Sequence, residues 1–399
     1  MILTILIFII ILGILVFVHE FGHFVVAKRS GMKIDEFGFG FPPRLVGIQK
    51  TNGKWRWVWG HRSPLPNPPP QGEGIMRGVT AVSSPLRGEA GGGDDNTVYS
   101  INWIPLGGFV KILGEDNEHK EDPRSFINRP AKNRFFTLIA GVTMNLLLAW
   151  ALISIGHIVG LPVAVDDIGG LPRYAIFKDK KIGITEVVPD LPAFQAGVKA
   201  GDIVVSVDNQ TFDSVEALRS YIRVHAGQTF NFQITRSDSK LNLQINSLAQ
   251  PPEGQGPTGI ALAYFGKLST PWYLAFWEGA KTTSITIQNI FIGIYQLITG
   301  ELSWKVLGGP VKIAQLTGEA SRMGFIYIMQ FTAFLSLNLA ILNFLPFPAL
   351  DGGRILLLII EKVRRRRNNP KVEQILNTAG FIFLILLMIL VTIKDIKTK

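Results

Sequence analysis

The chain has 399 residues, of which 47% are hydrophobic, and a formal net charge of +10. It contains no cysteine, which excludes disulfide bonds and a thiolate zinc cluster. The basic residues lie beside long apolar runs, as at 364–367, which is typical of the cytoplasmic flanks of membrane helices and argues against a nucleic-acid-binding surface. The composition therefore favours a polytopic α-helical membrane protein with about four transmembrane helices.

The first predicted element is a membrane helix over residues 1–30. Its apolar run at 2–18 is also typical of a secretory signal peptide. However, the run has no basic region before it and no small-residue cleavage pattern after it, so we expect a retained span. Lys28, Arg29 and Lys33 place the end of this helix in the cytoplasm.

An HEFGH motif begins at His19, near the end of this helix. Helical positions four apart share one face, so His19 and His23 can hold one metal ion. Two imidazoles suit zinc, which needs a third protein ligand and an open position for water. Glu20 would then act as the general base toward that water. Two chance histidines are the alternative, but ionisable groups at membrane depth are costly and usually functional.

Residues 31–113 are predicted to form a membrane-associated, re-entrant β-hairpin region on the cytoplasmic side. Alternating glycine and phenylalanine at 35–43 suit an extended turn that dips into the membrane. The alternating segments 55–59 and 98–103 are interpreted as the two arms of one hairpin. Between them, residues 61–95 are rich in proline and glycine and are predicted to be a disordered insertion without a metal site.

A second span is predicted at 134–160, running outward from its basic cytoplasmic end. Asn145 within it could pack against a neighbouring helix or line a site, and helix packing is the preferred interpretation. Residues 165–265 then change to charged, strand-like segments separated by turns. This change predicts one small extracytoplasmic α+β domain.

The last third of the chain contains two more predicted spans. Residues 272–322 are expected to form an interfacial amphipathic region, although whether 272–299 lies on the membrane or spans it stays open. The third span, 324–360, must run inward if its end is to meet the site on the first helix. The fourth span, 374–394, then runs outward.

Asp351 is the predicted third metal ligand, in the NFLPFPALDGG segment at 343–353. A proline-broken segment at membrane depth lets a side chain turn inward, which is expected only around a cavity. An ordinary Asp-Gly-Gly turn is the alternative. Asn338 and Asn343 lie on the same inward-running element. Either could position substrate by donating a hydrogen bond to an oxyanion or to the substrate backbone, or could be a helix-packing contact.

These motifs occur in order with GFGFPPRL, NWIPLGGFVKILGED, PDLPAFQAGVKAGD and LGGPVKIAQ. Together they resemble a bacterial site-2 protease of the RseP type, an intramembrane zinc metalloprotease. The resemblance implies one Zn²⁺ per chain on His19, His23 and Asp351, with Glu20 as general base. It further implies that residues 165–265 are a PDZ-like domain.

The resemblance also implies a substrate and a location. The substrate would be the transmembrane helix of a membrane protein, such as an anti-sigma factor or a remnant signal peptide, cut after an upstream protease trims its outer domain. The protein would lie in the bacterial inner membrane, with its active site toward the cytoplasm and its PDZ-like domain on the periplasmic face. The glycine-rich segment around Gly38 and Gly40 would meet the substrate as an added strand.

Three features depart from the family pattern. Ala140 and Gly141 are followed by Val142, where the family often has proline, and only one PDZ-like unit is evident, where some relatives carry two. The 61–95 insertion lies in the region expected to touch substrate. Two other classes compete with the protease. A catalytically silent scaffold that binds partners through the PDZ-like domain has no use for buried ionisable groups. A transporter is disfavoured because the spans show no internal repeat.

Overall fold

The computed structural model describes residues 2–51, 53–60, 97–115, 121–236 and 239–397. The predicted insertion at 61–95 lies outside the described residues. The chain divides into two compact units, of which the first holds the predicted metal ligands. The first unit comprises Met1–Leu147, Lys305–Gln315 and Leu335–Lys399, and the second comprises Leu148–Trp304 and Leu316–Phe334.

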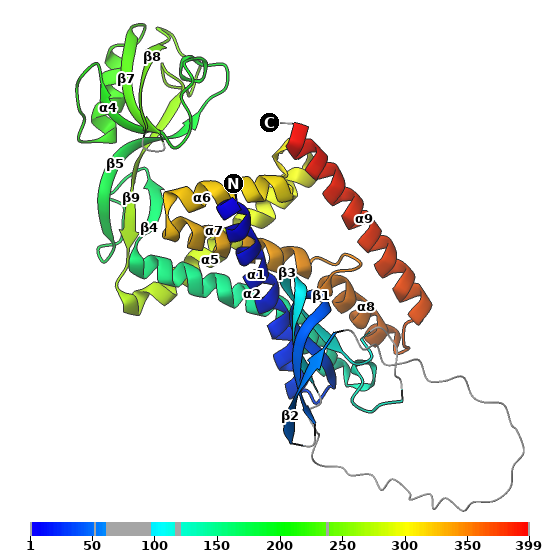
Figure 1. The fold of residues 1–399 in the computed structure, drawn as a ribbon. Helices are drawn as coiled ribbons and strands as arrows, with labels where there is room; N and C mark the ends of the chain where they lie inside the picture. The colour runs from blue at the N-terminus through cyan, green and yellow to red at the C-terminus, as the bar shows by residue number, and fades with distance from the viewer. Residues whose placement is uncertain (1, 52, 61–96, 116–120, 237–238, 398–399) are drawn as a thin grey trace, which may run out of the picture. The chain divides into compact units, whose positions relative to one another are not determined.

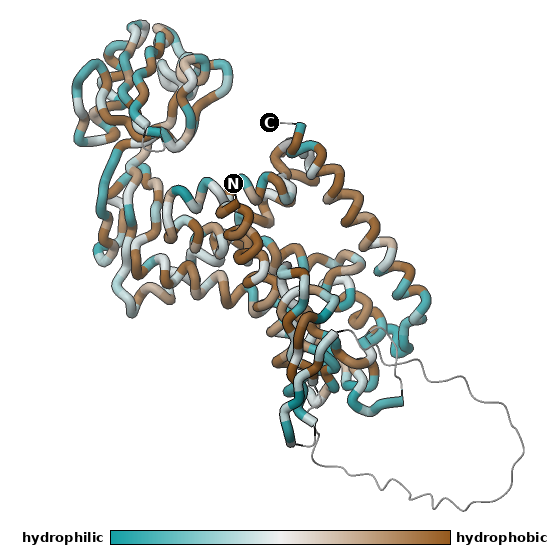
Figure 2. The backbone as a smooth tube through the Cα atoms, viewed as in Figure 1, coloured by the Kyte–Doolittle hydropathy of each residue, from teal (hydrophilic) through white to brown (hydrophobic). Residues whose placement is uncertain are grey.

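Four described helices are long and apolar enough to cross a membrane, which fits the expectation of about four transmembrane helices. They are α1 (Ile2–Arg29), α2 (Ala131–Val159), α7 (Phe325–Phe344) and α9 (Pro370–Lys397). Only 6% of the most apolar window of α9 is buried, and Figure 2 shows apolar residues along most of this helix. Side chains that are apolar and uncovered fit a helix that faces lipid. The chain is therefore a polytopic membrane protein.

The other described helices are shorter or more polar. The helix α5 (Trp272–Thr299) is not among the candidate spans, because polar residues interrupt its apolar run. It is followed by η2 (Trp304–Val306) and α6 (Pro310–Met323), and η1 (Phe126–Asn128) precedes α2.

The predicted third span, 324–360, is two helices rather than one. The helix α7 ends at Phe344, and α8 (Asp351–Arg364) begins after a turn that contains Pro346 and Pro348. Proline has no N–H to continue a helix, which explains the break. A Cβ atom on Gly352 would lie 2.2 Å from the Phe344 carbonyl oxygen, so only glycine lets α8 begin this close to the end of α7.

The first unit contains a three-stranded sheet that the sequence reasoning paired wrongly. Its strands are β1 (Ile34–Thr51), β2 (Lys54–Trp59) and β3 (Val98–Ile112), in the order β2-β1-β3. Segments 55–59 and 98–103 are therefore not the arms of one hairpin, since β1 lies between them. The true hairpin joins β1 to β2, with Thr51 opposite Lys54. The sequence Asn52-Gly53 between them is a strong short-range hairpin signal that could have revealed this pairing.

An apolar cluster attaches this sheet to the C-terminal half of α1. Phe24 and Ala27 of α1 pack with Ile34 and Phe37 of β1 and Ile112 of β3. The rings of Phe24 and Phe37 stack with centroids 4.6 Å apart. Because Phe24 is one turn beyond Glu20, this packing holds the sheet beside the HEFGH motif.

The second unit contains an antiparallel six-stranded sheet in the order β4-β9-β5-β6-β7-β8 (Figure 1). Its strands are β4 (Leu161–Val165), β5 (Ile176–Val187), β6 (Ile203–Val207), β7 (Thr229–Arg236), β8 (Ser239–Asn246) and β9 (Ile260–Ser269). Two helices, α3 (Pro192–Gln195) and α4 (Val215–Val224), accompany it. The core includes Leu218, Phe230 and Phe232, which are almost fully buried. The strands and helices from Leu161 to Ser269 thus form an α+β domain with its own core, a few residues longer at each end than the predicted 165–265.

Candidate metal centre

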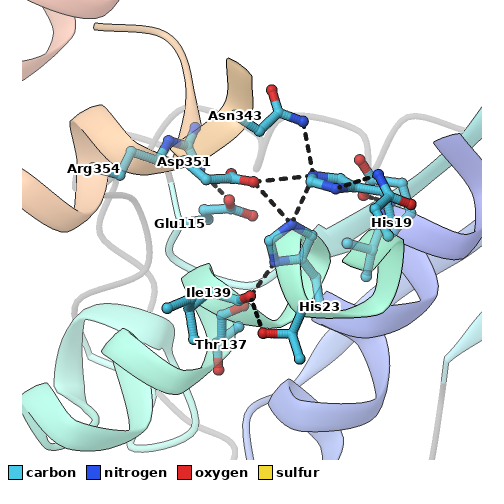
Figure 3. A network of polar contacts seen from close by, with 12 residues as sticks. His19, His23, Glu115, Thr137, Ile139, Asn343, Asp351 and Arg354 are labelled. Carbon is cyan, nitrogen blue, oxygen red and sulfur yellow. Dashed lines mark hydrogen bonds and ion pairs between the residues drawn. The ribbon is translucent and has the colours of Figure 1, made fainter. Parts of the chain in front are cut away.

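The side chains of His19, His23 and Asp351 meet at one point (Figure 3). The Asp351 Oδ2 atom lies 3.0 Å from His19 Nε2 and 3.3 Å from His23 Nε2. All three potential ligand atoms lie within 4.8 Å of one another. Two imidazole nitrogens and one carboxylate oxygen are a donor set that zinc accepts, with room for a fourth, non-protein ligand. The residues present therefore fit the zinc ion expected from the sequence.

A hydrogen bond to the backbone fixes the orientation of His23. Its Nδ1 atom lies 2.7 Å from the carbonyl oxygen of Thr137 in α2. A carbonyl oxygen only accepts, so Nδ1 must carry the proton and donate. In the neutral ring, Nε2 then keeps its lone pair, and Nε2 is the atom that faces Asp351. A metal-ligating histidine usually has such a partner on its other nitrogen.

Asn145 is the polar partner of the Nδ1 atom of His19, as the Thr137 carbonyl oxygen is for His23. Its amide nitrogen lies 3.3 Å from His19 Nδ1, and its side chain is fully buried. Asn145 Oδ1 has no hydrogen-bond partner. The two ends of an amide have the same shape, and turning the amide over would let Oδ1 accept from His19 Nδ1–H. That arrangement satisfies the buried oxygen and leaves His19 Nε2 for a metal ion. Asn145 therefore lines the site, and its backbone carbonyl oxygen also accepts a hydrogen bond from Ser336 of α7, so the site-lining and helix-packing interpretations both apply.

Gly141 forms part of the wall of the centre. A Cβ atom at this position would lie 2.4 Å from His23 Nε2 and 2.7 Å from His19 Nε2. Any side chain would thus occupy the space where the ligand atoms converge. Sequence reasoning noted Ala140 and Gly141 only as a departure from a family pattern and missed this role. An adjacent Ala-Gly pair in an apolar span, which lets another helix approach closely, is the signal that could have revealed it.

Glu20 lies in a cleft of about 430 Å³ that also contains His23 and Asp351. Its Oε2 atom accepts a hydrogen bond of 3.1 Å from the backbone N–H of Val110. The strand β3, to which Val110 belongs, is an edge strand of its sheet. The cleft is lined by Glu20, His23, Asp35, residues 109–115, Ala349, Asp351 and Arg354. The candidate base, two metal ligands and a strand edge therefore share one cavity.

Asn343 and Asn338 differ in their relation to the centre. The Asn343 Nδ2 atom lies 3.4 Å from His19 Nε2, so this amide reaches the point where the metal ligands meet (Figure 3). Asn338 lies earlier on α7 and is half-buried, and the described lining of the cleft does not include it. The structure thus brings Asn343 to the centre and places Asn338 farther along the helix.

Gly38 and Gly40 lie inside the sheet. Gly38 is opposite Phe109 and also opposite Ser100, because the bent strand β3 passes β1 on two sides. The Gly40 carbonyl oxygen accepts a hydrogen bond of 2.8 Å from Asn102 Nδ2. With strand partners on both sides, Gly38 has no open backbone edge, so it cannot receive a substrate strand as expected. The edge that faces Glu20 is residues 109–112 of β3.

Comparison with known proteins identifies the family. Residues 7–59 and 90–387 match peptidase family M50. The chain belongs to this family. The zinc metalloprotease RasP of Geobacillus kaustophilus is 27% identical in an alignment that covers 98% of this chain and 97% of that protein. The regulator of sigma-W protease RasP of Bacillus subtilis is 28% identical in an alignment that covers 99% of this chain and 98% of that protein.

The chain is accordingly a zinc metalloprotease of the site-2 type. Membership of a peptidase family therefore argues against the two alternatives, a catalytically silent scaffold and a transporter. Among solved structures, the PDZ domain of an SdrC-like protein from Listeria innocua is similar to 21% of this chain and 92% of its own length, at 24% identity and a TM-score of 0.19.

Proposed function

We propose that this M50 peptidase hydrolyses peptide bonds within the transmembrane segments of membrane proteins. One zinc ion per chain is held by His19, His23 and Asp351, and Glu20 is the general base. The observation that carries this proposal is the single cleft that contains Glu20, Asp351 and the open edge of β3. When bound, the zinc ion supplies a Lewis acid that activates water for attack on a peptide carbonyl.

Glu20 moves the protons of the reaction. Its carboxylate accepts a proton from the attacking water and delivers it to the nitrogen of the leaving peptide. Asn343 donates an amide N–H toward the oxyanion that develops on the attacked carbonyl, since its Nδ2 atom already reaches the ligand cluster. Asn338, earlier on α7, positions the substrate backbone at a greater distance from the reacting atoms.

Substrate is bound as an added strand on β3. A transmembrane helix hides its carbonyl groups in its own hydrogen bonds, and local unwinding in the membrane requires replacement partners. Residues 109–112 offer such an edge. The N–H of Val110 points away from β1 and toward Glu20, so it is the donor that a substrate carbonyl would take. Taking this donor also releases Glu20 from its hydrogen bond, so that substrate binding frees the base.

Charge and the relatives support the proposed location. Lys28 and Arg29 end α1, and α8 ends in a basic run, which supports a bacterial inner-membrane protein with its active site toward the cytoplasm. The α+β domain at 165–265 is then a PDZ-like module on the periplasmic face. The name of the Bacillus subtilis relative, a regulator of sigma-W, supports an anti-sigma factor as one substrate type. Remnant signal peptides are a second type, and an upstream protease would first trim the outer domain of a longer substrate.

The test is the position of the cut. Purified wild-type protein is mixed in lipid vesicles with a single-span substrate whose outer domain has been removed, and the products are sequenced by mass spectrometry. The proposal predicts a cut within the apolar segment. A cut only in the flanking polar residues would contradict it.

A further inference from the structure

Arg354 and Glu115 form an ion pair on the lining of the catalytic cleft (Figure 3). Arg354 is three residues beyond Asp351 on α8, so the two side chains lie on neighbouring turns of one helix face. Glu115 follows the end of β3 by three residues. The pair therefore joins the helix that carries a metal ligand to the strand that offers the open edge.

The surroundings of this pair distinguish it from an ordinary surface ion pair. The exposed fractions of the two side chains are 29% for Arg354 and 25% for Glu115. A second cavity, of about 170 Å³, is also lined by both residues and by Gly114. The pair thus lines both the catalytic cleft and this neighbouring cavity. Fully exposed ion pairs contribute little to the free energy of folding. A half-buried, charge-assisted contact can fix the geometry of the groups that it joins.

We propose that Arg354 is a positioning residue that, through Glu115, holds the substrate-pairing edge of β3 at a fixed place relative to Asp351. The inference rests on the proposed function, because it concerns how a substrate strand meets the catalytic groups. A substrate paired with residues 109–112 must present its scissile carbonyl beside Asp351. Residues 109–112 belong to β3 and Asp351 belongs to α8. The ion pair between Arg354 and Glu115 connects these two elements.

Loss of the pair should weaken substrate binding more than chemistry. The metal ligands keep their own contacts, since Asp351 remains beside His19 and His23. The end of β3, however, would have to be ordered again each time a substrate strand binds, and that ordering costs binding free energy. The expected signature is a raised KM with a nearly unchanged kcat and a full zinc content.

The experiment is a double-mutant cycle on the full-length protein in detergent micelles. We expect Arg354→Gln and Glu115→Gln each to raise the apparent KM for a single-span substrate about tenfold, with kcat within about threefold. The double variant should be no worse than either single variant, because the residues act as one unit. Arg354→Lys should restore part of the loss, since it keeps the charge but not the guanidinium fork.

The Arg134–Glu361 ion pair provides a matched control. Arg134 Nη2 lies 2.7 Å from Glu361 Oε1, and the pair joins α2 to α8. It lines the smaller cavity but is not part of the described lining of the catalytic cleft. Arg134→Gln should lower thermal stability and leave KM unchanged.

The outcomes distinguish failure of the proposed proteolytic function from failure of the proposed role of Arg354 and Glu115. If the wild-type protein does not cleave, the proposed function fails and this inference fails with it. If it cleaves and both glutamine variants keep the wild-type KM, only the inference is overturned. An equal rise of KM in Arg134→Gln, or a loss of zinc in Arg354→Gln and Glu115→Gln, would likewise overturn it, because the pair would then be a general structural brace.

Discussion

The backbone N–H of Val110 donates a hydrogen bond to the Glu20 carboxylate over 3.1 Å, so the edge strand of the sheet contacts the proposed general base directly. Both residues line the cleft that contains Asp351. The apolar packing of Phe24 against Phe37 and Ile112 holds the sheet in this position on α1. In the proposed mechanism, this one backbone donor links strand pairing to proton transfer.

Replacing Val110 with proline tests this coupling. Proline removes the N–H, and it is tolerated on an edge strand where that N–H points away from the neighbouring strand. Val110→Pro should raise the apparent KM roughly tenfold or more, because the substrate loses a hydrogen bond and its carbonyl is left unpaired. Steady-state cleavage in micelles measures this change. Val110→Ala keeps the N–H and should stay within about threefold of wild type. Equal activity of the two variants would contradict strand addition at this site.

Asn145 is expected to set the zinc affinity through His19. Asn145→Leu removes the partner of His19 Nδ1 at similar volume, and losses of such outer partners weaken metal binding by about 10–100-fold. Asn145→Asp supplies a carboxylate acceptor for Nδ1–H and should retain most of the affinity. Competition with a zinc chelator measures both variants. An unchanged affinity in Asn145→Leu would show that this contact is only helix packing.

Gly141→Ala should abolish zinc binding. The added methyl carbon would lie 2.4 Å from His23 Nε2, where the ligands converge. The fold itself should survive, since alanine is the better helix former by roughly 0.5–1 kcal/mol. Metal analysis of the purified variant is the readout. Gly293→Ala in α5, where the new methyl group meets nothing within 4 Å, is the matched control and should keep its zinc. Full zinc content in Gly141→Ala would contradict the ligand geometry.

The spacing of residues in the sequence was enough to predict the three metal ligands, because each depends on the geometry of a single helix or turn. The separation of His19 and His23 by four residues puts both on one helical face, and the proline-broken segment signals that Asp351 can turn inward. The structure brings these three side chains together. The expected α+β segment at 165–265 likewise follows from its alternating strands and turns.

Contacts that depend on helix and strand packing were not predictable in this way. Asn145 and Gly141 reach the centre because α2 packs against α1 in one particular rotation, which periodicity does not specify. The order of the strands was missed for a related reason. Alternation shows that a segment is a strand but does not identify its neighbour, so Gly38 was expected at an open edge and lies between two strand partners.

The central claim is that Glu20 and a zinc ion on His19, His23 and Asp351 form one catalytic centre. The most direct measurement is cleavage of a single-span substrate by purified wild-type protein and by Glu20→Gln, with bound zinc quantified in both. The account predicts about one zinc per chain in each protein and cleavage by wild type alone, with the variant slower by roughly a hundredfold or more. Cleavage by Glu20→Gln at the wild-type rate, or wild-type protein that cleaves without zinc, would contradict it.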